Sequence, residues 1–271
     1  MSKTGLYLSR IVKYGLYAIL LTPLVFWPRA LYAFATPKFI LFQVLIEIVF
    51  AAWLILKVID SGNQSLLRKN YIVVSLTLFF VISLISAIFG IDFGRSFWGI
   101  GARMTGLFAE LHFFAWFLVL ISYFKGGKEN WRHYLNFSFW VSILVALSVF
   151  YQNAEWALAW GFSTVFNNPT FVAPYLIFHF FWGLYQTSNY RLSPYGKSPE
   201  RRQITNYRRG LFGVGTVFLS FIILLIRIRG AILGLLAGLL FLGLGLIFSH
   251  ILSRRSKILL SVFYFLIFLS L

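Results

Sequence analysis

The feature that most constrains this chain is a succession of apolar runs, each close to the length that crosses a bilayer. A membrane-spanning helix needs about 20 apolar residues. Lipid offers no partner to an unpaired backbone group, so continuously apolar runs must fold as helices. We therefore expect an all-α, polytopic transmembrane helical bundle that forms one transmembrane domain over residues 1–271. About nine spans are expected, the last of them incomplete: 14–34, 38–57, 71–90, 107–124, 134–153, 169–187, 211–226, 231–249 and 258–271.

Composition narrows the class of protein further. Charged residues make up only 11% of the chain and the mean hydropathy is +0.83, whereas soluble domains carry about 25% charged residues. A net charge of +17 would suggest nucleic acid as the partner of a soluble protein. In a membrane protein a positive charge instead reports which loops face the cytoplasm. We therefore expect the lipid bilayer as a partner, and no nucleic-acid partner. No cysteine is present and the four histidines are scattered, so no metal site or cofactor is expected.

The distribution of lysine and arginine predicts the orientation. With the N-terminus in the cytoplasm and spans that alternate, eighteen of the 24 basic residues fall on the cytoplasmic side and six on the other. Cytoplasmic loops are enriched in Lys and Arg, so this orientation is favoured. The polar segment 188–210 becomes a cytoplasmic basic loop, which we expect to be mobile and attracted to anionic lipid. A cleaved signal peptide is the alternative at the N-terminus, but the long apolar stretch favours an uncleaved first helix.

The run from Leu211 to Phe248 holds only two charges, Arg227 and Arg229, both near its middle. As a single helix it would be about 57 Å long, whereas the bilayer core is about 30 Å thick. We therefore predict a helical hairpin with both arginines at its outward turn, where Gly230 suits a tight turn. Two guanidinium groups at a helix start are able to grip a diphosphate. Anchoring at the lipid headgroups is the alternative.

A second outward cluster of charges lies between the third and fourth expected spans. It comprises Asp92, Arg95, Arg103, Glu110 and His112. Glu110 and His112 are one to two turns inside the fourth span, where ionisable groups usually face a cavity or a partner. For the arginines, snorkelling to the headgroups is again the alternative.

Two further residues invite a functional interpretation. Asn168 precedes Pro169, an order typical of a helix start with Asn as the N-cap, although its amide is also able to meet a sugar or pyrophosphate. Glu47 lies in the middle of the second span. A carboxylate there must pair, be protonated or line a cavity, and the sequence leaves the three open.

The outward motifs, in this order, resemble the O-antigen ligase and O-antigen polymerase family of bacterial membrane proteins. The resemblance covers most of the chain. It lies in "TPKFILFQVLIEIVFAAWLIL" (36–56), in "SFWGIGARMTGLF" (96–108) with its Arg-x-x-Gly pattern, in "FNNPTFVAPYL" (166–176) and in "RIRGAILGLLAGLL" (227–240). Family members often carry Ser before the Arg-Gly-Ala arginine, where this chain has Ile228.

The resemblance implies a metal-independent, inverting glycosyltransferase of the bacterial inner membrane. Its donor would be a glycan on undecaprenyl diphosphate, used at the periplasmic face in O-antigen or lipopolysaccharide biosynthesis, and its acceptor a glycan or lipid A-core. The family's diphosphate contacts would correspond to Arg103 and Arg229, less directly to Arg95 and Arg227. Asn168, Glu110 and His112 would line the site.

The family also has further spans and a periplasmic loop that carries a catalytic histidine, and none of the four histidines here matches it. We therefore expect the chain to be the N-terminal part of a longer ligase or polymerase, with its catalytic residue unidentified. Two other functions stay open. One is a transporter or flippase of a lipid-linked anionic glycan, and the other is a non-catalytic truncated membrane subunit.

Overall fold

The computed structural model describes residues 3–30, 32–59, 71–100, 104–124, 127–151, 165–166, 168–189 and 199–248. Over these residues the chain is helical and contains no strand, which confirms the predicted all-α class. The α-helices are α1 (Lys3–Ile19), α2 (Thr36–Ile59), α3 (Tyr71–Ile88), α4 (Phe93–Trp98), α5 (Leu107–Tyr123), α6 (Lys128–Leu147), α8 (Pro169–Asn189), α9 (Pro199–Ile226) and α10 (Arg229–Phe248). Two short 3₁₀ helices are η1 (Thr22–Leu24) and η2 (Ser148–Tyr151). The chain divides into two compact units, the first with α1 to α6 and the second with α8 to α10.

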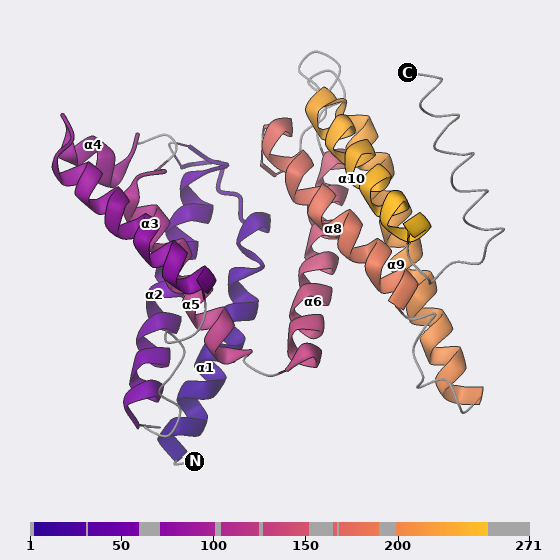
Figure 1. The fold of residues 1–271 in the computed structure, drawn as a ribbon, viewed down its shortest axis with the longest axis horizontal. Helices are drawn as coiled ribbons and strands as arrows, with labels where there is room; N and C mark the ends of the chain where they lie inside the picture. Colours follow the sequence, from indigo (N-terminus) through magenta and orange to yellow (C-terminus); the bar gives the residue numbers. More distant parts are fainter. Residues whose placement is uncertain are drawn as a thin grey trace. The chain divides into compact units, whose positions relative to one another are not determined.

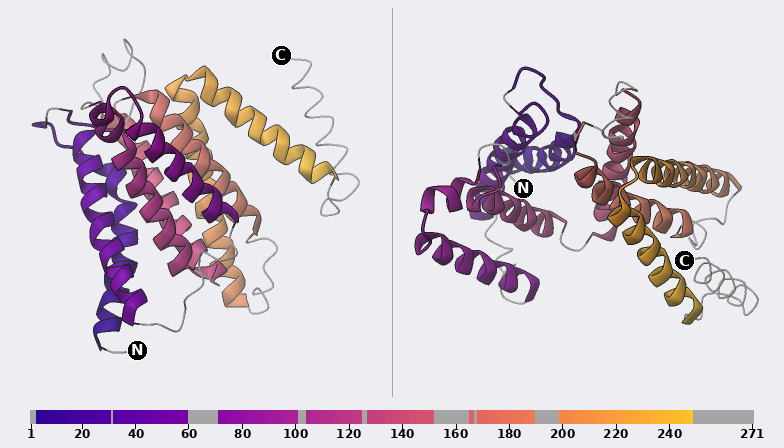
Figure 2. Two further views of the ribbon diagram at one scale, coloured as in Figure 1. Left: turned by 60° about the vertical axis from the view of Figure 1, so that its left-hand side comes forward. Right: turned by 90° about the horizontal axis from the view of Figure 1, so that it is seen from above.

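In the first unit, α1 lies along α2, and α5 packs against α2 as well (Figure 1, Figure 2). A Cβ atom on Gly15 would stand 2.2 Å from Cγ2 of Val49, so the close approach of α1 to α2 depends on a glycine at this position. The helix α3 and the short α4 both pack against α5. The start of α5 is therefore surrounded by other helices, and two of the predicted site residues lie there.

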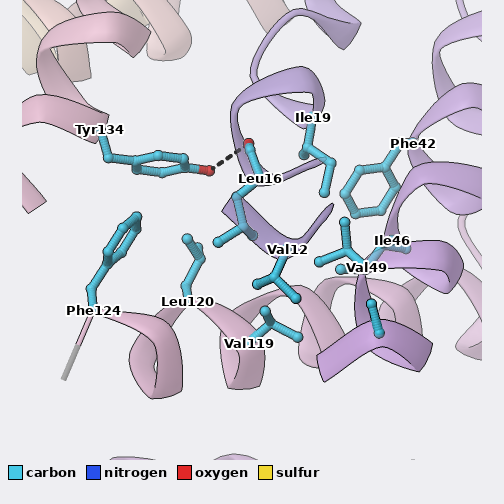
Figure 3. Packing of buried hydrophobic residues seen from close by; sticks show 11 residues of the cluster. Val12, Leu16, Ile19, Phe42, Ile46, Val49, Val119, Leu120, Phe124 and Tyr134 are labelled. Atoms are coloured by element: carbon cyan, nitrogen blue, oxygen red, sulfur yellow. Dashed lines mark hydrogen bonds between the residues drawn. The ribbon is translucent and has the colours of Figure 1, made fainter. Parts of the chain in front are cut away.

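A buried cluster forms the core of this unit (Figure 3). Its members on α1, and likewise on α2, follow the i, i+4, i+7 spacing that places residues on one helix face. The labelled residues are Val12, Leu16, Ile19, Phe42, Ile46, Val49, Val119, Leu120, Phe124 and Tyr134. The hydroxyl of Tyr134, on α6, donates to the carbonyl of Leu16 at 3.4 Å, the dashed line in Figure 3. The core thus joins α6 to α1 as well as α2 to α5.

In the second unit, α8 and α9 lie side by side (Figure 1, Figure 2). Fully buried residues on α8 include Val172 and Leu176, and those on α9 include Leu219 and Ile222. The helix α10 packs against both. At Gly238 of α10 a Cβ atom would stand 2.4 Å from Cζ of Phe181, so this glycine lets α10 approach α8.

Four helical segments among the described residues are long and apolar enough to cross a membrane. They are Thr36–Ile59, Tyr71–Ile88, Lys128–Phe150 and Asn206–Ile226. Two shorter apolar helices, Leu107–Tyr123 and Arg229–Gly245, accompany them. These helices indicate a membrane protein, as the apolar runs of the sequence predicted.

Two of the predicted segments differ from the structure. The continuous helix predicted for 14–34 is wrong, because α1 ends at Ile19 and is followed by η1 and turns. Pro23 and Pro28 lie in that region, and proline cannot supply the N–H that a helix interior needs. The loop predicted for 188–210 is wrong in its second half, because α9 begins at Pro199, which serves as a first helical residue. The predicted span 258–271 lies outside the described residues.

Candidate functional site

The predicted division of the run 211–248 into two helices is confirmed, and the turn between them is short, while its outward position stays a prediction. The helix α9 ends at Ile226 and α10 begins at Arg229, so Arg227 and Ile228 make the connection. Of these two residues, Arg227 has a left-handed backbone, at φ 58°. Gly230 was predicted to serve the turn, and this is wrong, because it already lies inside α10. Both arginine side chains are exposed.

The start of α8 is capped as the sequence predicted. The backbone N–H of Thr170 donates to Oδ1 of Asn168 at 2.9 Å, and the hydroxyl of Thr170 donates to the same oxygen. This is the bond that an N-cap residue provides to a helix start. The amide oxygen of Asn168 is therefore engaged within its own helix, while the residue as a whole remains exposed.

These two helix starts open on one cavity of about 530 Å³, which we call the hairpin pocket. It is lined by Thr170, Pro174, Ile177 and Phe178 of α8 and by Ile228, Gly230 and Ala231 of the hairpin. The lining is almost entirely apolar. Neither Arg227 nor Arg229 lines it, but the two residues on either side of Arg229 do.

The hairpin pocket combines an apolar lining with neighbouring groups that favour anions. The N-terminus of a helix carries a partial positive charge and unpaired N–H groups, which favour anions. Here α8 and α10 both begin beside the cavity, and two guanidinium groups lie in the adjoining turn. Pro174 also has no N–H to donate to the carbonyl of Thr170. An apolar chain with an anionic head matches this combination.

In the first unit, the predicted cluster around Arg95 is arranged by a short capped helix. The side chain of Asp92 accepts a hydrogen bond from the backbone N–H of Arg95 at 2.9 Å and so caps α4. The guanidinium of Arg95 is exposed. Arg103, which the sequence placed in the same cluster, lies outside the described residues.

The segment after α4 returns to α5 through a close contact between two glycines. A Cβ atom on Gly106 would stand 2.3 Å from the carbonyl oxygen of Phe97 and 2.4 Å from the backbone nitrogen of Gly99. Gly99 itself has φ 77°, a conformation that favours glycine. Gly106, part of the Arg-x-x-Gly pattern, is thus required by sterics where the chain enters α5.

Glu110 belongs to a second cavity of about 360 Å³ between α3, α4 and α5, which we call the serine pocket. Its polar lining residues are Ser83, Ser86, Ser96, Thr105 and Glu110, and its other lining residues are Phe79, Ile82, Ala87, Gly106 and Leu107. The two serines of α3 are three residues apart, so they share one face of that helix. In contrast to the hairpin pocket, half of these lining residues are polar.

His112 is separated from Glu110 by the geometry of α5. Two residues along an α-helix rotate the side chain by about 200°, so the two groups face nearly opposite directions. Nε2 of His112 lies 3.1 Å from Oε1 of Glu47 on α2. His112 is only 8% exposed. The sequence grouped Glu110 and His112 in one cluster, whereas the structure gives each its own surroundings.

Both ring nitrogens of His112 have a hydrogen-bond partner. Nδ1 donates to the carbonyl of Phe108, one turn earlier on α5, at 2.7 Å. Nε2 faces the carboxyl of Glu47. The sequence left open whether Glu47 pairs with another group, is protonated or lines a cavity. The structure shows that it pairs with His112.

Lys38, at the start of α2, holds a distant segment of the same unit. Its ammonium group donates to the carbonyl of Val165 and lies 4.9 Å from the centre of the Phe166 ring. The N–H of Val165 donates to the hydroxyl of Ser148 at 3.1 Å. Both backbone groups of Val165 are therefore engaged, three residues before Asn168 in the chain.

Sequence reasoning missed the partner of Glu47 and the hydroxyl groups of the serine pocket. Ser83 and Ser86 lie on one face of an otherwise apolar run, and this spacing could have predicted the pocket from the sequence. Among the described residues, no group of three or more His, Cys, Asp or Glu side chains is able to hold a metal ion. Comparisons with models of protein families, with curated proteins and with solved structures find no match.

Proposed function

We propose that this chain transfers, or polymerises, a glycan from an undecaprenyl-diphosphate donor at the periplasmic face of the bacterial inner membrane. The observation that carries the proposal is the hairpin pocket, an apolar cavity where two helix starts meet beside Arg227 and Arg229. A polyprenyl diphosphate is an apolar chain with a doubly charged head, which matches that arrangement. The O-antigen ligase and polymerase family uses this class of donor.

The proposal includes the predicted topology of about nine spans with a cytoplasmic N-terminus. Two features are consistent with it. The starts of α8 and α10, both predicted to be outward, line the same pocket. In the first unit, Lys38 binds the carbonyl of Val165, and both were also predicted to be outward. Single cysteines at Gly196 and Asn167, in a chain with no native cysteine, should be labelled from opposite sides of the membrane.

The transfer needs charge stabilisation more than a metal ion. An acceptor hydroxyl attacks the anomeric carbon, the bond from that carbon to the diphosphate oxygen breaks, and the hydroxyl proton passes to a base. The lipid diphosphate leaves with the additional negative charge. Preorganised guanidinium groups and helix N-termini stabilise charge of this kind. We assign that role to Arg229 and Arg227, which belong to the turn beside the hairpin pocket, and we assign the base to no residue.

The test replaces Arg229 with alanine in the native host. Loss of one charge-stabilising donor typically lowers the rate by about 10²–10³, so surface glycan should fall to background while the protein remains in the membrane. Arg208→Ala is the matched control, because Arg208 is an exposed arginine in the first half of α9, away from the turn. Normal surface glycan with Arg229→Ala would refute the proposal.

The Glu47–His112 pair favours a second function, a transporter of lipid-linked anionic glycans coupled to protons. A carboxyl and an imidazole in hydrogen-bond contact within membrane-spanning helices are the kind of groups from which proton relays are built. Purified protein in vesicles should then flip a fluorescent polyprenyl diphosphate faster under a pH gradient, and Glu47→Gln should abolish that dependence. No flipping above protein-free vesicles would exclude the transporter.

A further inference from the structure

We propose that the serine pocket binds a sugar ring, or a polyhydroxylated ligand of the same size, through the hydroxyl groups of Ser83, Ser86, Ser96 and Thr105 and the carboxylate of Glu110. The proposal does not depend on donor transfer, because a free monosaccharide is enough to test it.

The first support is that these polar groups are available. Hydroxyl groups in apolar helices usually bond to a carbonyl three or four residues earlier. The hydroxyls of Thr77, Ser142 and Thr216 do so here. Within the part of the chain that the structure describes, the polar side chains of the serine pocket make no hydrogen bond or ion pair.

The second support is that these groups, from three different helices and their ends, line one pocket. The serines belong to α3 and α4, Thr105 precedes α5, and Glu110 lies in the first turn of α5. Hydroxyl groups both donate and accept, and a carboxylate accepts. A ring with several hydroxyl groups is a ligand that can satisfy all of them together. Phe79, Ile82 and Leu107 add an apolar surface for the C–H face of such a ring.

The third support is the size of the cavity. Pockets for small molecules occupy about 300–1,000 Å³, and the serine pocket has about 360 Å³. A bare cation would need oxygen ligands within about 2.3–2.6 Å on several sides, which suits a much smaller cavity. One carboxylate in a hydroxyl lining therefore favours a neutral, polyhydroxylated ligand over an ion.

The fourth support is that the lining is preorganised. The Asp92 cap fixes the start of α4, which carries Ser96. The contact between Gly106 and the backbone of Phe97 and Gly99 fixes the position of the residue before it, Thr105. Ligand binding to prearranged groups avoids much of the entropic cost of ordering them.

The experiment measures binding of N-acetylglucosamine and of glucose to the purified full chain by saturation-transfer NMR. The chain is held in phospholipid nanodiscs, because sugar-headed detergents would compete for the site. Loss of two neutral hydrogen bonds corresponds to about tenfold weaker binding. Ser83→Ala with Ser86→Ala should therefore bind about tenfold more weakly, and Glu110→Gln should weaken binding by a similar factor.

The matched control is Ser75→Ala, because Ser75 is an exposed serine of α3 that does not line the pocket. Its binding should equal that of the unmodified chain. If the double variant fails to give a monodisperse, helical protein, Ser96→Ala on the short α4 takes its place, with weaker binding still expected. Arg229→Ala should bind the sugar normally, which separates this proposal from the proposed transfer.

Equal affinity in the pocket variants and in Ser75→Ala would overturn the proposal. So would the absence of sugar binding to the unmodified chain. A thermal stabilisation by NaCl that Glu110→Gln removes, without any sugar binding, would identify a cation site and also overturn it.

Discussion

The serine pocket and the hairpin pocket are both built at helix starts, yet their linings have opposite character. The hairpin pocket is lined by aliphatic and aromatic side chains, with its charges displaced to the neighbouring turn. The serine pocket is lined by four hydroxyl groups and a carboxylate. The helix starts therefore contribute the same feature to both pockets, namely unpaired backbone N–H groups. The neighbouring helix decides whether the lining of the pocket is apolar or polar.

The largest effect expected of a change inside the hairpin pocket comes from filling it. Gly230 lines the hairpin pocket, and a Cβ atom there would meet nothing within 4 Å, so a longer side chain has room without a backbone clash. Gly230→Leu should weaken binding of undecaprenyl diphosphate at least about tenfold, equivalent to about 1.4 kcal/mol. Native mass spectrometry of the purified chain measures it.

Gly230→Ala is the control for this change. It leaves most of the cavity open and should retain donor binding, while alanine in a helix stabilises by about 0.5–1 kcal/mol relative to glycine. Sugar binding to the serine pocket should be the same in both variants. Unchanged donor binding with Gly230→Leu would show that the hairpin pocket is not the donor site.

A smaller effect is expected at the cap of α8. Asn168→Ala removes the acceptor for the N–H of Thr170 and should lower the free energy of unfolding by about 1 kcal/mol. Asn168→Asp keeps an acceptor and adds a negative charge near a helix N-terminus, so stability should be retained. Denaturant unfolding in mixed micelles measures both.

The same pair of variants separates capping from a direct role. If Asn168 only caps α8, the aspartate variant should also retain surface glycan. A loss of glycan in a variant of normal stability would instead place Asn168 in contact with the substrate.

The smallest effect is expected from two variants that act on opposite faces of α5, Glu47→Gln and Glu110→Gln. Glu47→Gln keeps a side chain that hydrogen-bonds to His112, and the carboxyl of Glu47 is 60% exposed. The free energy of unfolding should therefore change by less than about 1 kcal/mol, and sugar binding should not change. Glu110→Gln should do the reverse, with stability kept and sugar binding weakened. Sugar binding that depended on Glu47 would contradict the separation of the two faces.

The apolar runs were enough to predict most helices, because a continuous run of about 20 apolar residues has few alternatives in lipid. The hairpin followed from length alone, since no single helix of the run from Leu211 to Phe248 fits the bilayer. The break after Ile19 was less visible, because Pro23 and Pro28 stand among apolar residues whose hydropathy hides them. The helical extension of α9 back to Pro199 was hidden by polar residues that resemble a loop.

The site residues were harder to predict, because function depends on which helices become neighbours. The sequence places Glu110 and His112 two residues apart, but only the packing of α5 shows that one faces α3 and α4 while the other meets Glu47. Ser83 and Ser86 likewise acquire a meaning only beside α4 and α5. The N-cap role of Asn168 was predictable, because it needs no neighbour beyond its own chain.

The left-handed backbone of Arg227 lowers the stability of the turn, while its side chain places a positive charge there. A residue with a side chain costs about 1 kcal/mol or more in that conformation, and glycine adopts it freely. Arg227→Gly should therefore make the hairpin more stable while it removes a guanidinium group from the turn. A sequence optimised for folding alone would place glycine there, and the chain instead holds a cation in a backbone conformation that disfavours it.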